Sequence, residues 1–267
     1  MNRKKRGFFK LIIGKQKNCP GRYFLYRAVF IIIFLFVISC ASIQGSSSGH
    51  HDFSSFNDKS FNAETALWLN EGAQSRITPA IAQAASQING SNRRERLNKA
   101  VDYVWKNFSF KNWHSDKAFA LTADELFRGK KLGGCSDFAL VSVALFRSAG
   151  IPSRLVITAN VDWMPAFQKN ELLMTTGHVF VEAYLEEKWY LIDPTNRLLF
   201  GGYDESKRCY PNREYLCLRG IDYWDMGVTG VSDLNSILRK EAVAFKTEQY
   251  IDPGYTATSL KKNINSP

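Results

Sequence analysis

The spacing of apolar residues changes along the chain, from helical periodicity in the first half to strand-like runs in the second. Apolar positions recur every three or four residues in three early segments, and the stretch 138–146 is apolar except for Ser142. Short β-branched or alternating runs follow. The pattern predicts helices at 63–73, 79–88, 93–107 and 232–245. It predicts strands at 154–160, 178–185, 188–193 and 198–200.

This order of elements predicts an α+β fold, in which an all-helical front half precedes an antiparallel sheet. A helix as apolar as 138–146 is expected to be central and buried. The long link at 161–176 has no clear periodicity, and links of this length in a compact domain are often functional flaps. The polar residues 251–267 are expected to form a frayed tail.

A candidate nucleophile lies at the start of the buried helix. Gly133 and Gly134 lead into Cys135, and Gly150 with Pro152 ends the helical run. Cys135 is therefore expected at a helix N-terminus, where unpaired N–H groups and the helix dipole favour a thiolate and can stabilise an oxyanion. Read alone, Cys135 could equally be a small buried apolar residue.

A histidine and an aspartate open and close the predicted hairpin. If Glu186 and Glu187 form a two-residue turn, Phe180 faces Asp193, and His178 becomes a diagonal neighbour of Asp193 on the same face. Asp193 would then orient the imidazole of His178, and His178 would exchange a proton with Cys135 and the leaving group. The predicted catalytic residues are Cys135, His178 and Asp193.

The positive charge of the chain belongs to a targeting segment. The formal net charge is +10, yet residues 1–39 contain nine Lys and Arg and no acidic residue, so the remainder is nearly neutral. This distribution argues against a nucleic-acid partner. The basic segment precedes the apolar run Ala28–Ile38, which has the length of a signal-peptide core and is too short to span a bilayer.

The apolar run ends at Cys40 in a sequence that resembles a bacterial lipobox, in which the cysteine is lipidated. The alternative is an uncleaved anchor, and both interpretations export the rest of the chain. We expect a signal peptide or anchor at 1–39, a flexible tether at 40–60 and a folded domain at 61–250. The protein would face the periplasm or the cell exterior, attached to the membrane of the cell envelope.

The remaining cysteines predict a crosslink. Cys209 and Cys217 are close in sequence, and an exported chain folds under oxidising conditions, so a disulfide is expected, although two reduced thiols remain the alternative. We expect no metal site, because no second Cys or His pair lies near them. No calcium-binding loop pattern is present, and we expect no cofactor.

Five short stretches resemble the core of the transglutaminase-like superfamily. They begin at Leu121 (LTADELFR), Gly133 (GGCSDFA), Ser148 (SAGIPSR), Gly177 (GHVFVE) and Trp189 (WYLIDPT). The resemblance covers roughly residues 95–200 and implies a papain-like arrangement of helices against an antiparallel sheet. It implies the same roles for Cys135, His178 and Asp193.

The resemblance also implies an upstream side chain at the oxyanion. Trp113 is the predicted donor, although nothing in the sequence selects it over Trp105 or Asn112. The expected activity is that of a thiol enzyme acting on amide bonds of a protein or peptide through a Cys135 thioester. We favour a peptidase or amidase over a cross-linking transglutaminase. The alternatives are a non-catalytic binding module on the same fold and an envelope interaction protein; the oligomeric state is open.

Overall fold

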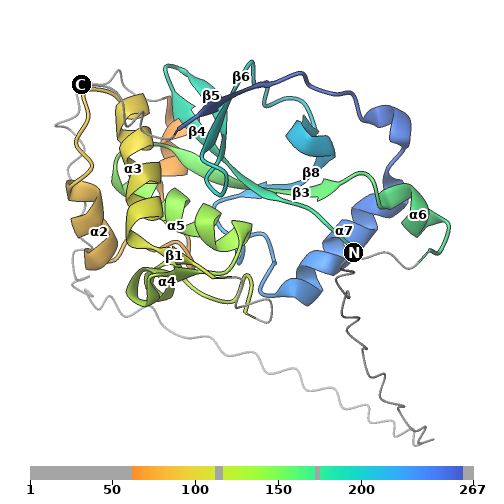
Figure 1. The fold of residues 1–267 in the computed structure, drawn as a ribbon, viewed down its shortest axis with the longest axis horizontal. Coiled ribbons are helices and arrows are strands. Elements are labelled where there is room, and N and C mark those ends of the chain that lie inside the picture. Colours follow the sequence, from red (N-terminus) through yellow and green to blue (C-terminus); the bar gives the residue numbers. More distant parts are fainter. Residues whose placement is uncertain (1–61, 112–116, 172–174, 261–267) are drawn as a thin grey trace, which may run out of the picture. The chain divides into compact units, whose positions relative to one another are not determined.

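A computed structural model describes residues 62–111, 117–171 and 175–260 of the chain. These residues combine helices with a seven-stranded antiparallel sheet, which confirms the predicted α+β class. In Figure 1, α2, α3, α4 and α5 gather at one end of the sheet, and α6 and α7 at the other. The helices are α1 (Ala63–Ala66), η2 (Leu67–Leu69), α2 (Pro79–Ser86), α3 (Arg93–Asn107), α4 (Ala123–Gly129), α5 (Cys135–Ser148), α6 (Met164–Gln168), η3 (Pro211–Arg213), α7 (Val231–Ala244) and η4 (Thr247–Gln249).

The large sheet has the strand order β7-β8-β3-β4-β5-β6-β9, and a separate parallel pair joins β1 to β2. The strands are β1 (Ser109–Phe110), β2 (Lys131–Leu132), β3 (Ser153–Asn160), β4 (Val179–Leu185), β5 (Lys188–Asp193), β6 (Leu198–Gly201), β7 (Cys209–Tyr210), β8 (Glu214–Gly220) and β9 (Thr256–Ser259). The predicted strands therefore form the middle of the sheet, whereas β7, β8 and β9 were not predicted.

Helix α5 is the central element of the domain, as its apolar run predicted. Residues 136–147 are all buried. The helix contacts α2, α3 and α4 on one side and β3 and β4 on the other. Leu155 and Ile157 of β3 and Val181 of β4 share one hydrophobic core with it. A helix buried this completely gives its first residue a fixed position relative to the sheet.

The β4–β5 hairpin has the predicted two-residue turn. Glu186 and Glu187 both have positive φ angles, 51° and 64°, as in a type I′ turn, and Leu185 pairs with Lys188. The ladder continues to the pair Val181 and Ile192 without a bulge. This register brings the start of β4 beside the end of β5.

The first predicted helix, 63–73, is too long, because the chain leaves helical geometry at Asn70. The backbone N–H groups of Gln74 and Ser75 donate to the buried carboxylate of Asp222 at 2.7 and 3.2 Å. Gly72 lies so close to Asp222 that a Cβ there would be 2.1 Å from its Oδ2. A distant acidic residue therefore pulls this segment out of the helix.

The front helix α3 has its predicted bounds, and Asn92 caps it by accepting the N–H of Glu95 at 2.9 Å. Trp105, near the end of this helix, is 39% exposed although it is a large apolar residue. Its indole lies over Phe138, with ring centroids 5.3 Å apart, and its N–H donates to the carbonyl of Pro194 at 2.9 Å. Trp105 thus links α3 to α5 and to the end of β5.

The link at 161–176 carries a short helix in its described part. Trp163 and Met164 are buried in a core shared with Leu238, Ala242 and Phe245, the first two from α7. The amide of Gln168 donates to the carbonyls of Ala242 and Phe245 at 2.8 and 2.6 Å. The described part of the link is therefore a packed element rather than a free flap.

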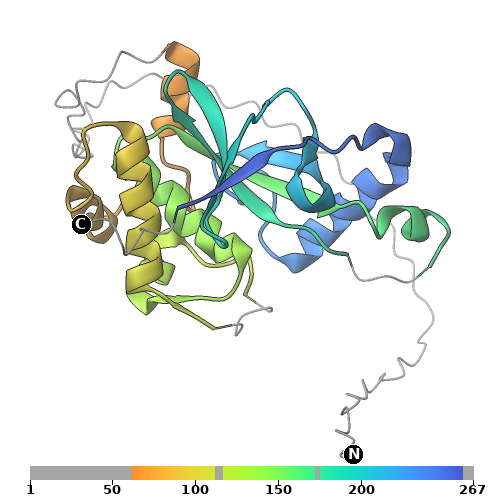
Figure 2. The same ribbon diagram turned by 45° about the horizontal axis from the view of Figure 1, so that its top comes forward.

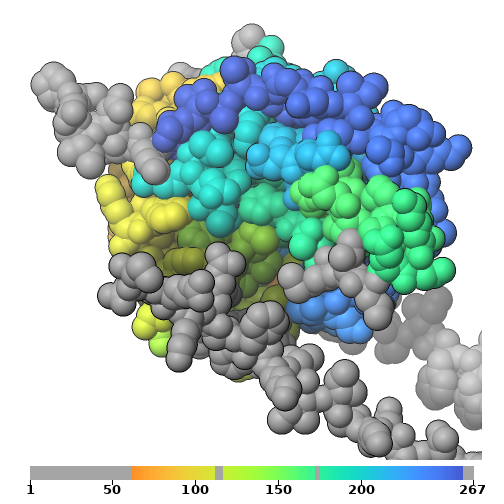
Figure 3. Space-filling model, turned by 45° about the vertical axis from the view of Figure 1, so that its right-hand side comes forward, coloured from red at the N-terminus to blue at the C-terminus, as the bar shows by residue number. Residues whose placement is uncertain are grey.

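The predicted frayed tail 251–267 contains strand β9, which pairs with β6 in antiparallel register from Leu198 opposite Ser259 to Gly201 opposite Thr256. Figure 2 shows this C-terminal segment, in dark blue, running from α7 along the edge of the sheet, and Figure 3 shows the blue C-terminal residues on the surface of the domain. The expectation of a frayed tail is therefore wrong for residues 256–259. Their ladder bonds extend the sheet beyond β6, the last strand that the sequence predicted.

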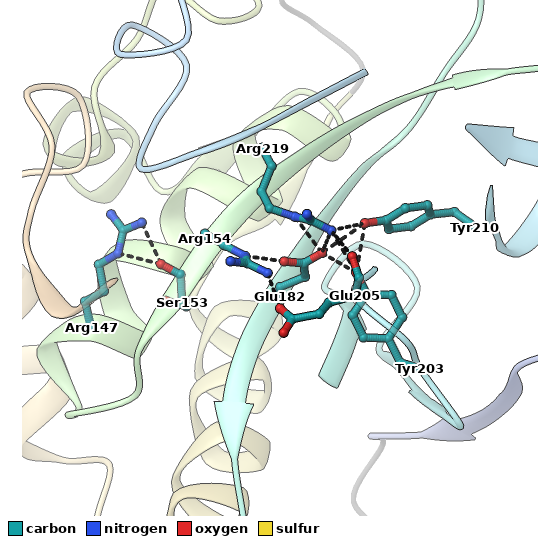
Figure 4. A network of polar contacts seen from close by, with 8 residues as sticks. All are labelled: Arg147, Ser153, Arg154, Glu182, Tyr203, Glu205, Tyr210 and Arg219. Carbon is teal, nitrogen blue, oxygen red and sulfur yellow. Dashed lines mark hydrogen bonds and ion pairs between the residues drawn. The ribbon is translucent and has the colours of Figure 1, made fainter. Parts of the chain in front are cut away.

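A buried carboxylate lies at the centre of a cluster of polar side chains on the large sheet. Glu182 of β4 is fully buried and accepts hydrogen bonds from Arg154, Arg219, Tyr203 and Tyr210 (Figure 4). The distances are 2.7 Å from Arg219 Nη2 and 2.9 Å from the Tyr210 hydroxyl. Because a buried charge is costly unless it is paired, this cluster holds β3, β4, β7 and β8 in a single arrangement.

Candidate active site

Cys135 is the first residue of α5, as predicted, and its side chain is half-buried. The preceding Gly134 is extended (φ −176°, ψ −170°), and a Cβ placed on it would meet none of the described residues within 4 Å. In the first turn of a helix the N–H groups have no helical acceptor, so they are available to a developing oxyanion.

Two residues that were not singled out hold the first turn of α5. The buried carboxylate of Asp137 accepts the backbone N–H of Gly133 at 2.7 Å. The buried hydroxyl of Tyr223 donates to the carbonyl of Ser136 at 2.8 Å. The Asp137 contact follows the known preference for acidic residues near helix N-termini, whereas nothing local indicates the Tyr223 contact.

His178 directly precedes β4, and its backbone is anchored to β3. Its carbonyl accepts the N–H and the hydroxyl of Thr158, both at 3.0 Å. Gly177 approaches the same strand so closely that a Cβ would be 2.1 Å from the carbonyl oxygen of Thr158. The imidazole contacts Phe180 edge to face, with centroids 4.7 Å apart, and its side chain is 19% exposed.

Asp193 ends β5, is fully buried and faces the imidazole. His178 Nε2 lies 3.1 Å from Asp193 Oδ2, although the N–H direction departs from a straight hydrogen bond. Such loose alignment is common in free active sites. Asn196, another residue that was not singled out, donates to the same carboxylate from its backbone N–H at 3.0 Å and from its amide at 2.7 Å.

The electrostatics of the three side chains are coupled. Burial acts to lower the pKa of His178, but hydrogen bonds to Asp193 and Cys135 and their charges outweigh it and raise this pKa to about 10. Burial acts to raise the pKa of Asp193, and His178 and Asn196 together hold it below its usual value. The imidazole is therefore stabilised as a cation between the thiol and the carboxylate.

The predicted oxyanion donor Trp113 and its rival Asn112 lie outside the described residues. The other rival, Trp105, directs its indole N–H to the carbonyl of Pro194, so this N–H is already used. The candidate lipid site, Cys40, also lies outside the described residues.

The predicted disulfide between Cys209 and Cys217 is not formed, and both thiols are free. Cys209 pairs across the ladder with Tyr215, and its sulfur contacts Gln249 and Ile251. Cys217 lies further along β8, its thiol donates to the carbonyl of Tyr215 at 3.6 Å, and burial raises its pKa to about 12. The two sulfurs are thus held by different neighbours.

Within the described ranges, no three His, Cys, Asp or Glu side chains are grouped so that they could hold a metal ion. The same part of the chain contains no helix long and apolar enough to cross a membrane.

A cysteine at a helix tip, a histidine before one strand and an aspartate at the end of the next form the arrangement of a thiol acyl-transfer site. The sequence model of the transglutaminase-like superfamily matches residues 82–194, a segment that contains all three residues. This segment is a transglutaminase-like domain. The match also includes most of α2, which the resemblance in the sequence had left out.

Two solved structures resemble the chain at low identity. A protein from Cytophaga hutchinsonii, described as a candidate cysteine protease, has 18% identity and a TM-score of 0.46 over 63% of this chain and 50% of its own. A protein described as a TGase has 14% identity and a TM-score of 0.36 over 74% and 53%. The chain therefore spans about half the length of each. None of the curated proteins matches the sequence.

Proposed function

We propose that the protein is a thiol enzyme that cleaves or transfers amide bonds through a thioester on Cys135. The observation that carries this proposal is the position of His178, whose Nε2 lies 3.1 Å from the buried carboxylate of Asp193 and whose pKa is raised by Asp193 and Cys135. A protein that only binds a partner has no need to bury an aspartate against a histidine beside an accessible thiol.

In the first step the sulfur of Cys135 attacks the amide carbonyl carbon, and the carbonyl π electrons move to oxygen. The C–N bond then breaks, its electron pair stays on nitrogen, and the His178 imidazolium gives that nitrogen its proton. In the second step neutral His178 takes a proton from the acceptor, whose oxygen or nitrogen attacks the thioester. The C–S bond breaks and the sulfur leaves with the electron pair.

Water as acceptor makes the enzyme a peptidase or amidase, and an amine makes it a cross-linking transglutaminase. We favour hydrolysis of peptide or protein in the cell envelope. The nine basic residues before Ala28–Ile38, and the sequence around Cys40, support export and attachment by a lipid on Cys40, with the domain facing the periplasm or the exterior.

The test exposes the full chain to a peptide mixture in ¹⁸O-labelled water, with and without an added alkylamine, and uses Cys135→Ser as the control. Incorporation of ¹⁸O into new carboxyl groups identifies hydrolysis, and incorporation of the amine identifies transfer. Hydroxylamine should trap the thioester as a hydroxamate. Peptide binding that is equal in the two proteins, with neither product, would replace this proposal by the binding module.

A further inference from the structure

One hydroxyl group beside the candidate site has two oxygen neighbours and a single hydrogen. Thr158 Oγ1 lies 3.0 Å from the carbonyl oxygen of His178 and 2.8 Å from Glu214 Oε2. A carbonyl oxygen and an ionised carboxylate can only accept, and a threonine hydroxyl donates once. With Glu214 ionised, Thr158 can therefore satisfy only one of the two contacts.

Protonation of Glu214 removes this conflict. A carboxylic acid donates its hydrogen to Thr158 Oγ1, and the Thr158 hydroxyl is then free to donate to the His178 carbonyl. That carbonyl also accepts the Thr158 N–H at 3.0 Å, so the two donors together hold the backbone of His178 against β3. Both short contacts are satisfied only in this state.

The surroundings of Glu214 favour the acid form. The residue is the first of β8, opposite Asn160 of β3, and is 6% exposed. Burial is the largest influence and raises its pKa above the ordinary value; the hydrogen bond with Thr158 lowers this pKa, and the nearby carboxylate of Asp162 raises it to a lesser extent. The charge of His178, before β4, acts in the opposite direction, and the thiol of Cys217 on β8 is a further titratable neighbour. Among the described residues, the second oxygen, Oε1, has a single long contact, 3.5 Å from the amide of Asn160.

We infer that Glu214 is a positioning residue for His178: as an acid it donates to Thr158, whose hydroxyl then donates to the His178 carbonyl, and ionisation of Glu214 breaks this chain. The inference rests on the proposed role of His178 as the base. No sequence pattern indicated Glu214, because it lies far from His178 along the chain and meets it only through β3.

The experiment follows the rate of Cys135 alkylation by iodoacetamide from pH 5 to 8 in the full chain. His178, with a pKa of about 10, stays protonated across this range. A step in the dependence of the alkylation rate on pH therefore comes from a group other than His178. Glu214→Gln keeps a donor to Thr158 at every pH, and Thr158→Val removes the hydroxyl at every pH. The alkylation rate of the parent should equal that of Glu214→Gln at acid pH and fall to that of Thr158→Val as Glu214 ionises. We call this change the crossover.

The expected separation between the Gln and Val variants is about threefold to tenfold, the size associated with one neutral hydrogen bond. Asp162→Asn removes an exposed carboxylate that raises the pKa of Glu214, so it should move the crossover to lower pH without changing the separation between the Gln and Val variants. Infrared spectra at pH about 5.5, where ordinary carboxyl groups are largely ionised, should show a protonated-acid band in the parent that Glu214→Gln lacks.

Parallel profiles for the parent, Gln and Val proteins, or no band that depends on Glu214, would overturn the inference. A merely structural role would lower the unfolding temperature of the variants without moving the profile. Alkylation needs no amide substrate, so a crossover without amide turnover would reject the proposed function and retain this inference. Amide turnover without a crossover would reject this inference and retain the proposed function.

Discussion

His178 Nε2 and Asp193 Oδ2 lie 3.1 Å apart because a two-residue turn at Glu186 and Glu187 sets the register of β4 against β5. The contact joins a partly exposed ring to a fully buried carboxylate. Asp193 helps to set the charge of His178, the candidate base. Each other side chain of the site acts on either His178 or Asp193.

Asp193→Asn tests the charge of this pair. It removes the hydrogen bond that raises the pKa of His178 most and one nearby negative charge, while Cys135 remains, so that pKa should fall from about 10 towards its ordinary value. Amide turnover should fall by about 100-fold or more, the usual scale for a lost acid–base contribution. Histidine NMR titration measures the pKa. Asn196→Ala, which removes only a donor to Asp193, should change both quantities less, and an unchanged His178 titration in Asp193→Asn would refute the assignment.

The raised pKa of His178 also predicts how stability depends on pH. The folded state binds this proton more tightly than the unfolded state, so the contribution is complete below pH about 6.5 and is lost as the pH rises towards about 10. The free energy of unfolding of the parent should therefore decline over this window more than that of His178→Asn. Urea titrations at pH 6 and 9.5 measure the difference. An equal decline in the two proteins would contradict the pKa.

Two glycines of the site should respond differently to alanine. Gly134 is extended and a Cβ there would meet none of the described residues within 4 Å, so Gly134→Ala should change stability by about 1 kcal/mol or less. It should nevertheless reduce amide turnover, because its methyl group narrows the approach to Cys135. Gly177→Ala places a Cβ against the Thr158 carbonyl and should cost more than about 2 kcal/mol. Thermal unfolding and turnover separate the two effects, and unchanged turnover in a folded Gly134→Ala would exclude this route for the substrate.

The buried Glu182 should matter for folding rather than for chemistry. Glu182→Gln leaves the guanidinium groups of Arg154 and Arg219 without their carboxylate, which should cost about 3–5 kcal/mol. Glu205 also pairs with Arg154 but has a 45% exposed side chain, so Glu205→Gln should cost less than about 1 kcal/mol. Urea unfolding compares the two variants. Similar losses of unfolding free energy in the two variants would show that burial of a carboxylate does not decide its contribution to stability.

The membrane attachment can be tested at Cys40. Cys40→Ser should abolish incorporation of a labelled fatty acid and stop cleavage of the signal segment, so the variant keeps its basic N-terminus. Cys19→Ser, in the segment that is removed, is the control and should behave as the parent. A parent protein that carries no lipid and retains residues 1–39 would favour the uncleaved anchor.

The local features of the fold were predictable because short segments of sequence determine them. The apolar run of α5, the cap at Asn92 and the capping box of Thr122 with Glu125 depend on neighbours within four residues. The distance between His178 and Asp193 follows from a two-residue turn and the alternation of strand side chains. For the same reason the order Cys135, His178, Asp193 was sufficient to predict the arrangement of the site.

Contacts between distant segments required the tertiary structure. Asp222 draws Gln74 and Ser75 out of a helix, the Pro194 carbonyl takes the Trp105 N–H, and residues 256–259 find their ladder partners on β6. Glu214 reaches His178 only through Thr158 of the strand between them. The sequence by itself determined the buried helix α5, the hairpin and the three candidate catalytic side chains. Only the folded chain decided which buried polar groups hold them in place, because those groups find their hydrogen-bond partners far along the sequence.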